Sequence, residues 1–398
     1  MQRVSACAAA ESLAVIRPDQ PRPRRVALIA SSFAPYVGGV EEHVRHVAHA
    51  LQHDGVTVEV WTVERAGRSS VRDVDGISVR DLPAPLPAVS FTALLRFMMR
   101  GLPAWATWVS ATRAFRPDLL HVQCFGPNGV YALALSRTFG IPLIVTSHGE
   151  TVADDHGAYR ESVTLRWSLR KAIARASAVT APSGFVLRDL QEHYGLRTGQ
   201  VVPNGIDMNV LADRSTELGR VFVAVGRLGR MKGFDLLIAA FAAADVDPSI
   251  GLEIIGDGPE HQNLRELVEA HDLVSRVRFR GWLDRQGVAN AMAASVAVVV
   301  PSRTEAFGIV ALEAWRAGAP LIMTSRGGAA EFVTDGVNGV LVDPRDQVAL
   351  AEALKAVAED AKLREIIVAG GRSSVGGFAW SRVSELYEAI YDSALART

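Results

Sequence analysis

Short apolar runs alternate with helical stretches along most of the chain, and the alternation occurs in two series. The runs of the first series lie at 26–30, 56–63, 77–80, 119–122, 143–146 and 178–181. Those of the second lie at 221–225, 252–255, 277–279, 296–300, 321–324 and 339–342. Buried strands that alternate with helices form parallel sheets covered on both faces. The pattern therefore predicts an α/β protein made of two doubly wound, Rossmann-like domains.

The break between the two series sets the expected domain boundaries. We expect an N-terminal domain over 26–205 and a C-terminal domain over 206–380. Residues 381–398 have the spacing of an amphipathic helix. Residues 1–25 end in arginines set among prolines and predict a disordered basic arm. Open parallel sheets bind ligands at the carboxyl ends of their strands, so two facing sheets predict a site in the interdomain cleft.

Composition excludes several classes of protein. The net charge of -1 gives no reason to expect a nucleic acid partner. Cys7 and Cys124 are the whole cysteine content, which predicts no disulfide framework and favours a reducing, cytoplasmic setting. The apolar runs are too short to span a membrane, and Glu11 interrupts residues 4–16, which argues against a signal peptide. Residues 1–205 carry 22 basic and 17 acidic side chains, and this excess of cations favours an anionic partner unless it arose by chance.

The most specific pattern is Glu305-x7-Glu313, with Phe-Gly shortly after the first glutamate. Pro301 ends the preceding apolar run, so Glu305 is predicted to lie in a loop at the carboxyl end of a strand. A helix that begins near Gly308 would offer free backbone amides to an anion, with Glu313 one to two turns along it. This arrangement suits one carboxylate at a sugar and a second at ribose hydroxyls. The alternative is an ordinary helix start with two solvated acids.

Cations follow the first strand of the second series. Arg227 comes directly after the run 221–225, and Lys232 lies five residues further on, near the next helix start. Fixed cations can stabilise the charge that develops on a departing diphosphate without a metal. An exposed basic loop is the alternative. In the first series, His148 follows a strand at its carboxyl end. Gly38-Gly39 precede a helix, and the absence of side chains there allows the backbone to approach a phosphate or an acceptor closely.

In combination these motifs resemble the family 4 retaining glycosyltransferases, which have the GT-B fold. The resemblance runs from Val26 to the C-terminus and also includes the segments 202–207 and 256–260. It implies transfer of a hexose-type sugar, with retention of configuration, from a nucleotide diphosphate sugar. A UDP-sugar is favoured, a GDP-sugar is the alternative, and neither a cofactor nor a metal is required. The resemblance also implies that the C-terminal helix packs back on the N-terminal, acceptor-side domain.

Roles for individual residues follow from the same resemblance. Catalytic positions are His148, Arg227, Lys232 and Glu305. Donor-binding positions are Gly39, Arg227, Lys232, Leu283, Glu305, Phe307, Gly308, Ile309 and Glu313. Gly38 and Glu150 are expected on the acceptor side, and members of the family vary at the position of Glu150. The acceptor is expected to be a saccharide, a lipid-linked saccharide or a small glycoside.

Other functions fit less of the sequence. Asp73-Val-Asp75 and Asp245-Val-Asp247 match the Asp-x-Asp motif of metal-dependent transferases, but Gly or Pro follows each, which favours a surface turn. A nucleotide-sugar epimerase shares the expected architecture and would convert its donor without an acceptor. A non-catalytic nucleotide-sugar-binding subunit would not need Arg227, Lys232, Glu305 and Glu313 together. No Gly-x-Gly-x-x-Gly follows the first strand, which argues against a dinucleotide dehydrogenase.

Basic and apolar side chains are interleaved in two segments of the N-terminal half, 91–105 and 160–175. Such a mixture suits peripheral contact with an anionic membrane, here at its inner, cytoplasmic face, and a lipid-linked acceptor. The alternative, which we favour, is that the apolar residues face the sheet while the arginines are solvated.

Overall fold

The computed structural model describes residues 25–36, 38–64, 69–86, 91–152, 157–213 and 219–397, with the backbone alone for 91–98 and for Ala158. The chain forms two compact units. Unit 1 consists of Met1–Asn204 and Trp380–Thr398, and unit 2 consists of Gly205–Ala379. Apart from Arg25, which opens the first strand, the expected basic arm lies outside the described residues.

Unit 1 contains an eight-stranded sheet with the order β3-β4-β2-β1-β5-β6-β7-β8. The strands are β1 (Arg25–Ala30), β2 (Thr57–Val63), β3 (Ser70–Val74), β4 (Ile77–Leu82), β5 (Leu119–Gln123), β6 (Leu143–Thr146), β7 (Ala178–Ala181) and β8 (Gln200–Val201). The helices are α2 (Gly39–His53), α3 (Phe91–Phe115), α4 (Pro127–Phe139), α5 (Ala158–Glu161), α6 (Val163–Arg175), α7 (Gly184–Tyr194) and α14 (Trp380–Leu395). Its strands pair in parallel, except that β3 is antiparallel to β4.

Unit 2 contains a parallel six-stranded sheet with the order β11-β10-β9-β12-β13-β14. The strands are β9 (Val221–Val225), β10 (Gly251–Ile255), β11 (Val277–Gly281), β12 (Ala297–Val300), β13 (Leu321–Thr324) and β14 (Val340–Val342). The α-helices are α8 (Phe234–Ala243), α9 (His261–Ala270), α10 (Arg285–Ala293), α11 (Ile309–Ala317), α12 (Gln347–Glu359) and α13 (Ala361–Val375). Short 3-10 helices are η1 (Arg230–Lys232), η2 (Ala329–Glu331) and η3 (Gly376–Phe378).

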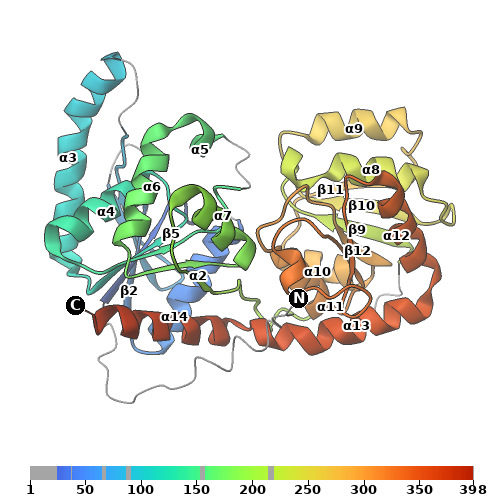
Figure 1. Cartoon of the computed structure of the whole chain (residues 1–398). Coiled ribbons are helices and arrows are strands. Elements are labelled where there is room, and N and C mark those ends of the chain that lie inside the picture. The colour runs from blue at the N-terminus through green and yellow to red at the C-terminus, as the bar shows by residue number, and fades with distance from the viewer. Residues whose placement is uncertain are drawn as a thin grey trace. The chain divides into compact units, whose positions relative to one another are not determined.

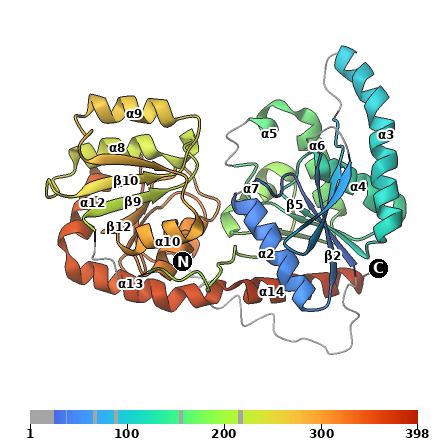
Figure 2. The same ribbon diagram turned by 180° about the vertical axis from the view of Figure 1, so that it is seen from behind.

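Helices cover both faces of each sheet (Figure 1). In unit 1, α2 and α14 share one hydrophobic core with the sheet, and Figure 2 shows α2 lying against α14. On the opposite face, Trp61 of β2 packs against Trp108 of α3, whose ring stacks on Tyr131 of α4. In unit 2, α8, α9 and α12 cover one face, while α10, α11 and α13 cover the other. The two covered parallel sheets confirm the α/β, doubly wound fold class.

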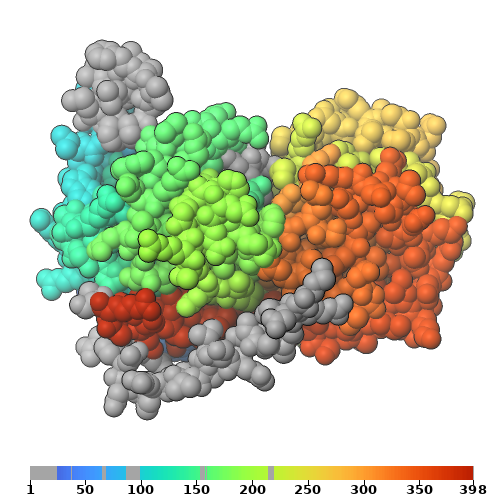
Figure 3. Space-filling model, viewed as in Figure 1, coloured from blue at the N-terminus to red at the C-terminus, as the bar shows by residue number. Residues whose placement is uncertain are grey.

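The amphipathic pattern of the last segment is explained by its packing in unit 1. Tyr387 and Tyr391 of α14 are fully buried, and Val383 is nearly so. The opposite face of the helix carries exposed charged residues such as Arg382 and Glu385, and Figure 3 shows part of α14 (red) at the surface. The helix is therefore held by its apolar and phenolic face.

Where the structure departs from the predicted elements, local chemistry explains the difference. The helical stretch between β6 and β7 is divided into α5 and α6 at Ser162, whose hydroxyl accepts a hydrogen bond from the amide of Leu165. The helical stretch after β14 is divided into α12 and α13 at Asp360, which caps α13 through the amide of Leu363. Side chains of this kind satisfy the free amides of a helix start. Strand β3 was not predicted, because its sequence is largely polar and it lies at the edge of the sheet.

Candidate functional site

The strand order of unit 2 reverses between β9 and β12, which are neighbours in the sheet. The loops that leave the carboxyl ends of two such strands diverge and open a crevice, where doubly wound sheets bind ligands. Arg227 and Lys232 lie in the loop after β9, and Glu305 lies in the loop after β12. Residues that the sequence singled out are thus placed at one point of the fold, although 73 positions separate Lys232 from Glu305.

Lys232 and Glu305 form an ion pair across these two loops. Lys232 Nζ lies 2.8 Å from Glu305 Oε2, and the Ser302 hydroxyl donates to the same oxygen at 2.9 Å. The glutamate side chain is 12% exposed, whereas that of the lysine is 37% exposed. The carboxylate is therefore fixed in place, while the ammonium group remains accessible to an anionic ligand.

Arg303 fastens the two loops together. Its guanidinium forms two bonds with the Asp235 carboxylate, at 2.7 and 2.6 Å, and donates to the carbonyl of Arg230 at 2.7 Å. The backbone amide of Arg303 donates to the carbonyl of Met231. The charged bonds hold the pKa of Asp235 below its usual value despite the opposing effect of burial. Paired bonds of this geometry fix orientation as well as supplying energy, so Arg303 determines where the η1 turn presents Lys232.

Glycines allow these loops to touch. Gly233 has φ +68°, and a Cβ there would lie 2.1 Å from the carbonyl oxygen of Pro301. Gly256, after β10, has φ +129°, and a Cβ there would lie 2.0 Å from the carbonyl oxygen of Gly226. No side chain fits at either distance, and both φ values strain an L-residue. The loops after β9, β10 and β12 therefore form one closely packed rim.

Helix α11 begins at this rim. Its N-cap residue is Gly308, with φ +95°. Because glycine has no side chain, Gly308 cannot cap the first backbone amides of the helix. Phe307 is buried and stacks on Phe332 with ring centroids 4.5 Å apart. Ile309 packs against the same core. The side chains at 307 and 309 therefore anchor the turn, and the backbone is the part available to a ligand.

The remaining predicted donor residues lie on neighbouring elements. Glu313 is half-buried on α11. Burial lowers the pKa of the neighbouring Arg316, and the negative charge of Glu313 partly offsets that shift. Leu283 lies after β11 and packs partly against the core. It is followed by Asp284, which caps α10 through the amide of Gly287. These positions border the same carboxyl edge of the sheet.

In unit 1 the strand order reverses between β1 and β5, and the first predicted site residues follow β1. Helix α2 begins at Gly39 itself, with Gly38 as its extended N-cap residue. A Cβ on Gly38 would lie 2.6 Å from Glu41 Oε2. Because Glu41 is long and flexible, this contact could be relieved, so the backbone does not demand glycine at 38.

His148 follows β6, one strand beyond the reversal, and its ring is fixed from inside the unit. Nε2 of His148 lies 2.8 Å from Oε1 of Gln123, the last residue of β5. A carboxamide oxygen can only accept, so His148 carries its proton on Nε2. Burial, with a smaller effect of His121, lowers the pKa of His148 to about 3. The histidine is therefore a neutral imidazole near pH 7, and its Nδ1 is the acceptor.

Glu150, which we expected on the acceptor side, is held by hydrogen bonds from within unit 1. Its carboxylate accepts from the amides of Phe125 and His148, at 2.9 and 2.7 Å, and from the hydroxyl of Ser147 at 3.0 Å. Burial raises the pKa of Glu150, while these donors oppose that shift. The carboxylate thus ties the loop after β5 to the loop after β6.

Sequence reasoning missed a buried polar network behind His148. His43 and His121 are fully buried, and each contacts a phenol of α14: His43 with Tyr387 at 3.0 Å, and His121 with Tyr391 at 2.6 Å. Burial is the main cause that lowers the pKa of both histidines, that of His121 to about 3. No sequence spacing relates these partners, which are 344 and 270 positions apart.

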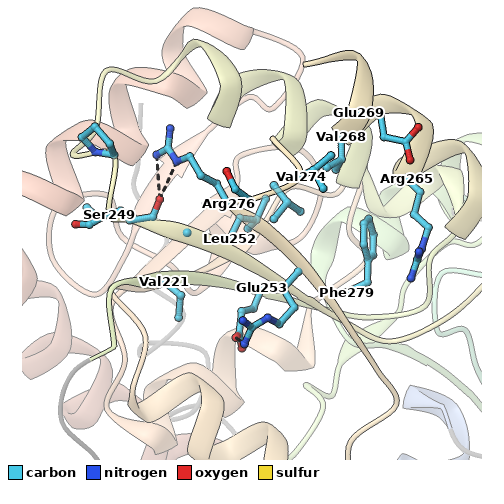
Figure 4. Close-up of a pocket in the computed structure, with 16 residues that line it drawn as sticks. Val221, Ser249, Leu252, Glu253, Arg265, Val268, Glu269, Val274, Arg276 and Phe279 are labelled. Carbon is cyan, nitrogen blue, oxygen red and sulfur yellow. Dashed lines mark hydrogen bonds and ion pairs between the residues drawn. The ribbon is translucent and has the colours of Figure 1, made fainter. Parts of the chain in front are cut away.

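A cavity of about 670 Å³ lies elsewhere in unit 2, at the amino ends of β9, β10 and β11 (Figure 4). There the guanidinium of Arg276 donates to the carbonyl of Ile250, and Arg265 lies beside the ring of Phe279. Its lining residues include none of the predicted site residues, all of which the structure describes. The cavity and the candidate site therefore occupy opposite ends of the strands.

The two Asp-x-Asp segments lie in turns, as expected. Asp75 and Gly76 form the two-residue turn of the β3–β4 hairpin, with φ +52° and +79°. Asp245 pairs with Lys355, and Asp247 pairs with Arg220 and accepts from the amide of Ser249. Within the described part of the chain, no group of three or more His, Cys, Asp or Glu side chains is arranged to hold a metal ion.

Comparison with known proteins agrees with this architecture. The family model "Glycosyltransferase Family 4" matches residues 37–210, and the model "Glycosyl transferases group 1" matches residues 212–374. The D-inositol 3-phosphate glycosyltransferase of Geodermatophilus obscurus is 30% identical over 95% of this chain and 91% of its own. An uncharacterised glycosyltransferase of Methanocaldococcus jannaschii is 26% identical over 92% of this chain and 98% of its own.

Solved structures share the fold. Sucrose-phosphate synthase from Thermosynechococcus elongatus has a TM-score of 0.79 at 24% identity, covering 94% of this chain and all of its own. Anabaena HepE in complex with UDP-glucose has a TM-score of 0.73 at 21% identity, covering 91% of this chain and 97% of its own. The two doubly wound units and the matching models define a glycosyltransferase of GT-B fold. The chain belongs to glycosyltransferase family 4.

Proposed function

We propose that the enzyme transfers a hexose-type sugar from a nucleotide diphosphate donor to an acceptor hydroxyl, with retention of the anomeric configuration. The observation that carries the proposal is the convergence of Arg227, Lys232 and Glu305 at the strand-order reversal of unit 2, beside the start of α11. A diphosphate gains negative charge as its bond to the sugar breaks. Cations and amides fixed before the reaction stabilise that charge most effectively.

Each donor contact in this proposal uses a group that the structure leaves suited to it. Arg227 and Lys232 hold the diphosphate. Glu305 and the backbone amides at 307–309 contact the sugar, and Glu313 accepts from the ribose hydroxyls. In the present structure Lys232 pairs with Glu305. A donor phosphate would compete for the ammonium group, which would leave the Glu305 carboxylate to bind sugar hydroxyls.

The proposed donor is a UDP-sugar, with a GDP-sugar as the alternative, and Leu283 is proposed to border the base of the donor. Anabaena HepE, which shares the fold, was solved in complex with UDP-glucose, and this supports the choice of uridine. Arg227 and Lys232 supply the positive charge that a divalent cation provides in other transferases, so we propose that the reaction needs no metal.

The acceptor is proposed to bind at the carboxyl ends of the unit 1 strands, near His148 and Gly38, with Gly39 near the donor phosphate. A saccharide, a lipid-linked saccharide and a small glycoside all fit this proposal. The name of the relative from Geodermatophilus obscurus specifies a phosphorylated inositol, which adds polyols to the candidates. Glu150 acts here through the His148 loop, because its carboxylate already accepts from three internal donors.

Retention is proposed to arise by attack from the face that the diphosphate leaves, with a departing phosphate oxygen taking the acceptor proton. Glu305 positions and polarises the sugar and is not a nucleophile in this scheme. The NMR spectrum of the first product tests it, because the anomeric coupling constant reports configuration. Appearance of the opposite anomer would exclude this mechanism.

A donor screen tests the function itself. UDP-, GDP- and ADP-sugars are compared by thermal shift, and the stabilising donor is then incubated with and without candidate acceptors. A transferase makes a glycoside and releases the nucleoside diphosphate. Conversion of the donor into an isomeric nucleotide sugar without an acceptor would instead support the epimerase alternative.

We further propose peripheral contact with the inner, cytoplasmic face of an anionic membrane. On α6, Val163 and Trp167 are 65% and 55% exposed, and Lys171 lies 5.7 Å from the Trp167 ring. On α3, Met99 and Leu102 are exposed, whereas the side chains at 91–98 lie outside the described residues. Among the described residues, no helix is both long enough and apolar enough to cross a bilayer.

Part of the predicted membrane pattern is engaged within unit 1. Leu165, Leu169 and Ile173 are buried, and Arg170 donates to the carbonyl of His193. Sedimentation with neutral and with anionic liposomes tests the proposal. Each basic residue near an anionic surface contributes roughly 1 kcal/mol, so binding should depend on lipid charge. Absence of binding to both liposomes, with full activity on a water-soluble acceptor, would exclude it.

A further inference from the structure

The two places where the chain crosses between the units both contact His43. Unit 1 is left after Asn204 and entered again at Trp380. His43 Nδ1 lies 2.9 Å from Asn204 Oδ1, and the rings of His43 and Trp380 meet edge-on with centroids 5.3 Å apart. Trp380 also stacks on His46, one turn further along α2, at 4.8 Å. A buried residue of α2 therefore contacts the chain at both crossing points.

The same ring meets His148. The centroids of His43 and His148 are 4.7 Å apart in an edge-on arrangement. His43 Nε2 lies 3.0 Å from the Tyr387 hydroxyl. The Gln123 carboxamide accepts from His148 through its oxygen, and its nitrogen lies 3.2 Å from Nε2 of His121. His43 is thus joined to His148 by a direct ring contact.

The donors and acceptors around His43 fix the direction of each hydrogen bond. The Asn204 oxygen only accepts, so His43 donates from Nδ1, and its neutral ring must accept at Nε2. Tyr387 then donates its proton to His43. The Gln123 oxygen accepts from His148 Nε2. Reversing any link would place two donors or two acceptors face to face in a buried site, which is costly.

We propose that His43 is a positioning residue for the transfer reaction. Through its edge-on ring contact it holds His148 in the orientation in which Nε2 donates to Gln123, and it links that orientation to Asn204 and Trp380. The role rests on the proposed function insofar as His148 faces the substrates. The imidazole network itself can be measured without any substrate.

Tyr387 and Tyr391 supply a matched pair of variants. Both are buried phenols one turn apart on α14, but the Tyr387 hydroxyl contacts His43 whereas the Tyr391 hydroxyl contacts His121. Long-range 15N NMR of histidine-labelled protein distinguishes Nδ1–H from Nε2–H imidazoles. We expect the wild type to show His43 as Nδ1–H and His148 as Nε2–H. Tyr387→Phe should shift both sets of signals, and Tyr391→Phe should leave the His43 signals in place.

Kinetics provide the second readout. Loss of the fixed His148 geometry in Tyr387→Phe should lower kcat by about 10- to 100-fold with little change in donor KM. Asn204→Ala removes the other partner of His43 and should give the same pattern if Tyr387→Phe does not fold. The proposal is overturned if the wild-type tautomers are reversed, or if both variants keep wild-type His148 signals and kcat. An NMR result as expected in a protein without transferase activity would instead contradict the proposed function alone.

Discussion

The two units share an architecture but fix their strand-end loops by opposite chemistry. In unit 2 the loops carry full charges, with Lys232 paired to Glu305 and Arg303 paired to Asp235. In unit 1 the region around His43 and His148 is held by neutral imidazoles, amides and phenols, and the Glu150 carboxylate beside it is bonded to backbone amides and a hydroxyl rather than to a cation. Charged loops suit a ligand that carries charge itself, such as a diphosphate. A neutral, buried network suits hydroxyl groups, whose position matters more than their charge.

Removing a cation from unit 2 should have the largest effect. Arg227→Ala or Lys232→Ala should lower turnover by about 100-fold or more, because each removes charge stabilisation of the leaving group. Steady-state kinetics measure the loss, and a thermal melt monitors folding. Arg220→Ala is the control, because Arg220 precedes β9 at the other end of the strand and pairs with Asp247. If Arg227→Ala and Lys232→Ala are as active as the control, the cations do not bind the diphosphate.

The neutral network should make unit 1 more sensitive to acid than unit 2. His43, His121 and His148 have pKa values below the usual 6.5, about 3 for the last two. For His121 and His148, between pH 6.5 and 3 the unfolded chain binds these protons and the folded chain does not, so stability falls as pH falls. Each of these two histidines contributes on the order of 1 kcal/mol per pH unit in that range, and His43 acts in the same direction.

Hydrogen exchange of the full chain at pH 7 and pH 5, corrected for intrinsic rates, measures this difference. Protection should fall in β5, β6 and α14 of unit 1 before it falls in the strands of unit 2. His53→Gln, at a highly exposed site on α2, serves as the control and should leave the pattern unchanged. Equal loss in both units would show that the buried histidines do not dominate the response.

The guanidinium clamp of unit 2 should show an intermediate effect. Arg303→Lys keeps the charge but cannot form the paired bonds to Asp235 and the bond to Arg230 together. We expect turnover to fall by about tenfold through misplacement of Lys232. In the background of Lys232→Ala the same change should cost little, because the group being positioned is absent. Additive losses in the double variant would contradict a role through Lys232.

Glu150→Gln should have the smallest effect. An amide keeps the shape of the side chain and one acceptor oxygen, so part of the bonding to Phe125, Ser147 and His148 survives. We expect a loss of stability of about 1–2 kcal/mol and a fall in turnover of a few-fold. Chemical denaturation measures the loss of stability, and kinetics at varied acceptor concentration measure the fall in turnover. A large rise in acceptor KM at unchanged stability would instead indicate that Glu150 contacts the acceptor directly.

Elements with strong periodicity could be predicted from the sequence, and long-range contacts could not. The apolar runs located the central strands because buried parallel strands are apolar on both faces. Ser162 and Asp360 were readable as helix caps and were overlooked. The clamp between Arg303 and Asp235 joins positions 68 apart, and no local pattern relates them. His43 belongs to an ordinary amphipathic helix, so only its partners in space reveal its importance.

Unit 1 is assembled from segments that the ribosome makes far apart in time. Helix α14 follows all of unit 2 in the chain, yet its phenols complete the hydrogen bonding of His43 and His121. Until α14 is synthesised, these imidazoles have no phenolic partner, and the core that α2 and α14 share with the sheet is incomplete. We therefore expect unit 2 to finish folding first, contrary to the usual N-terminal-first order of translation. The part of unit 1 before residue 205 is therefore expected to remain incompletely folded until α14 has been synthesised.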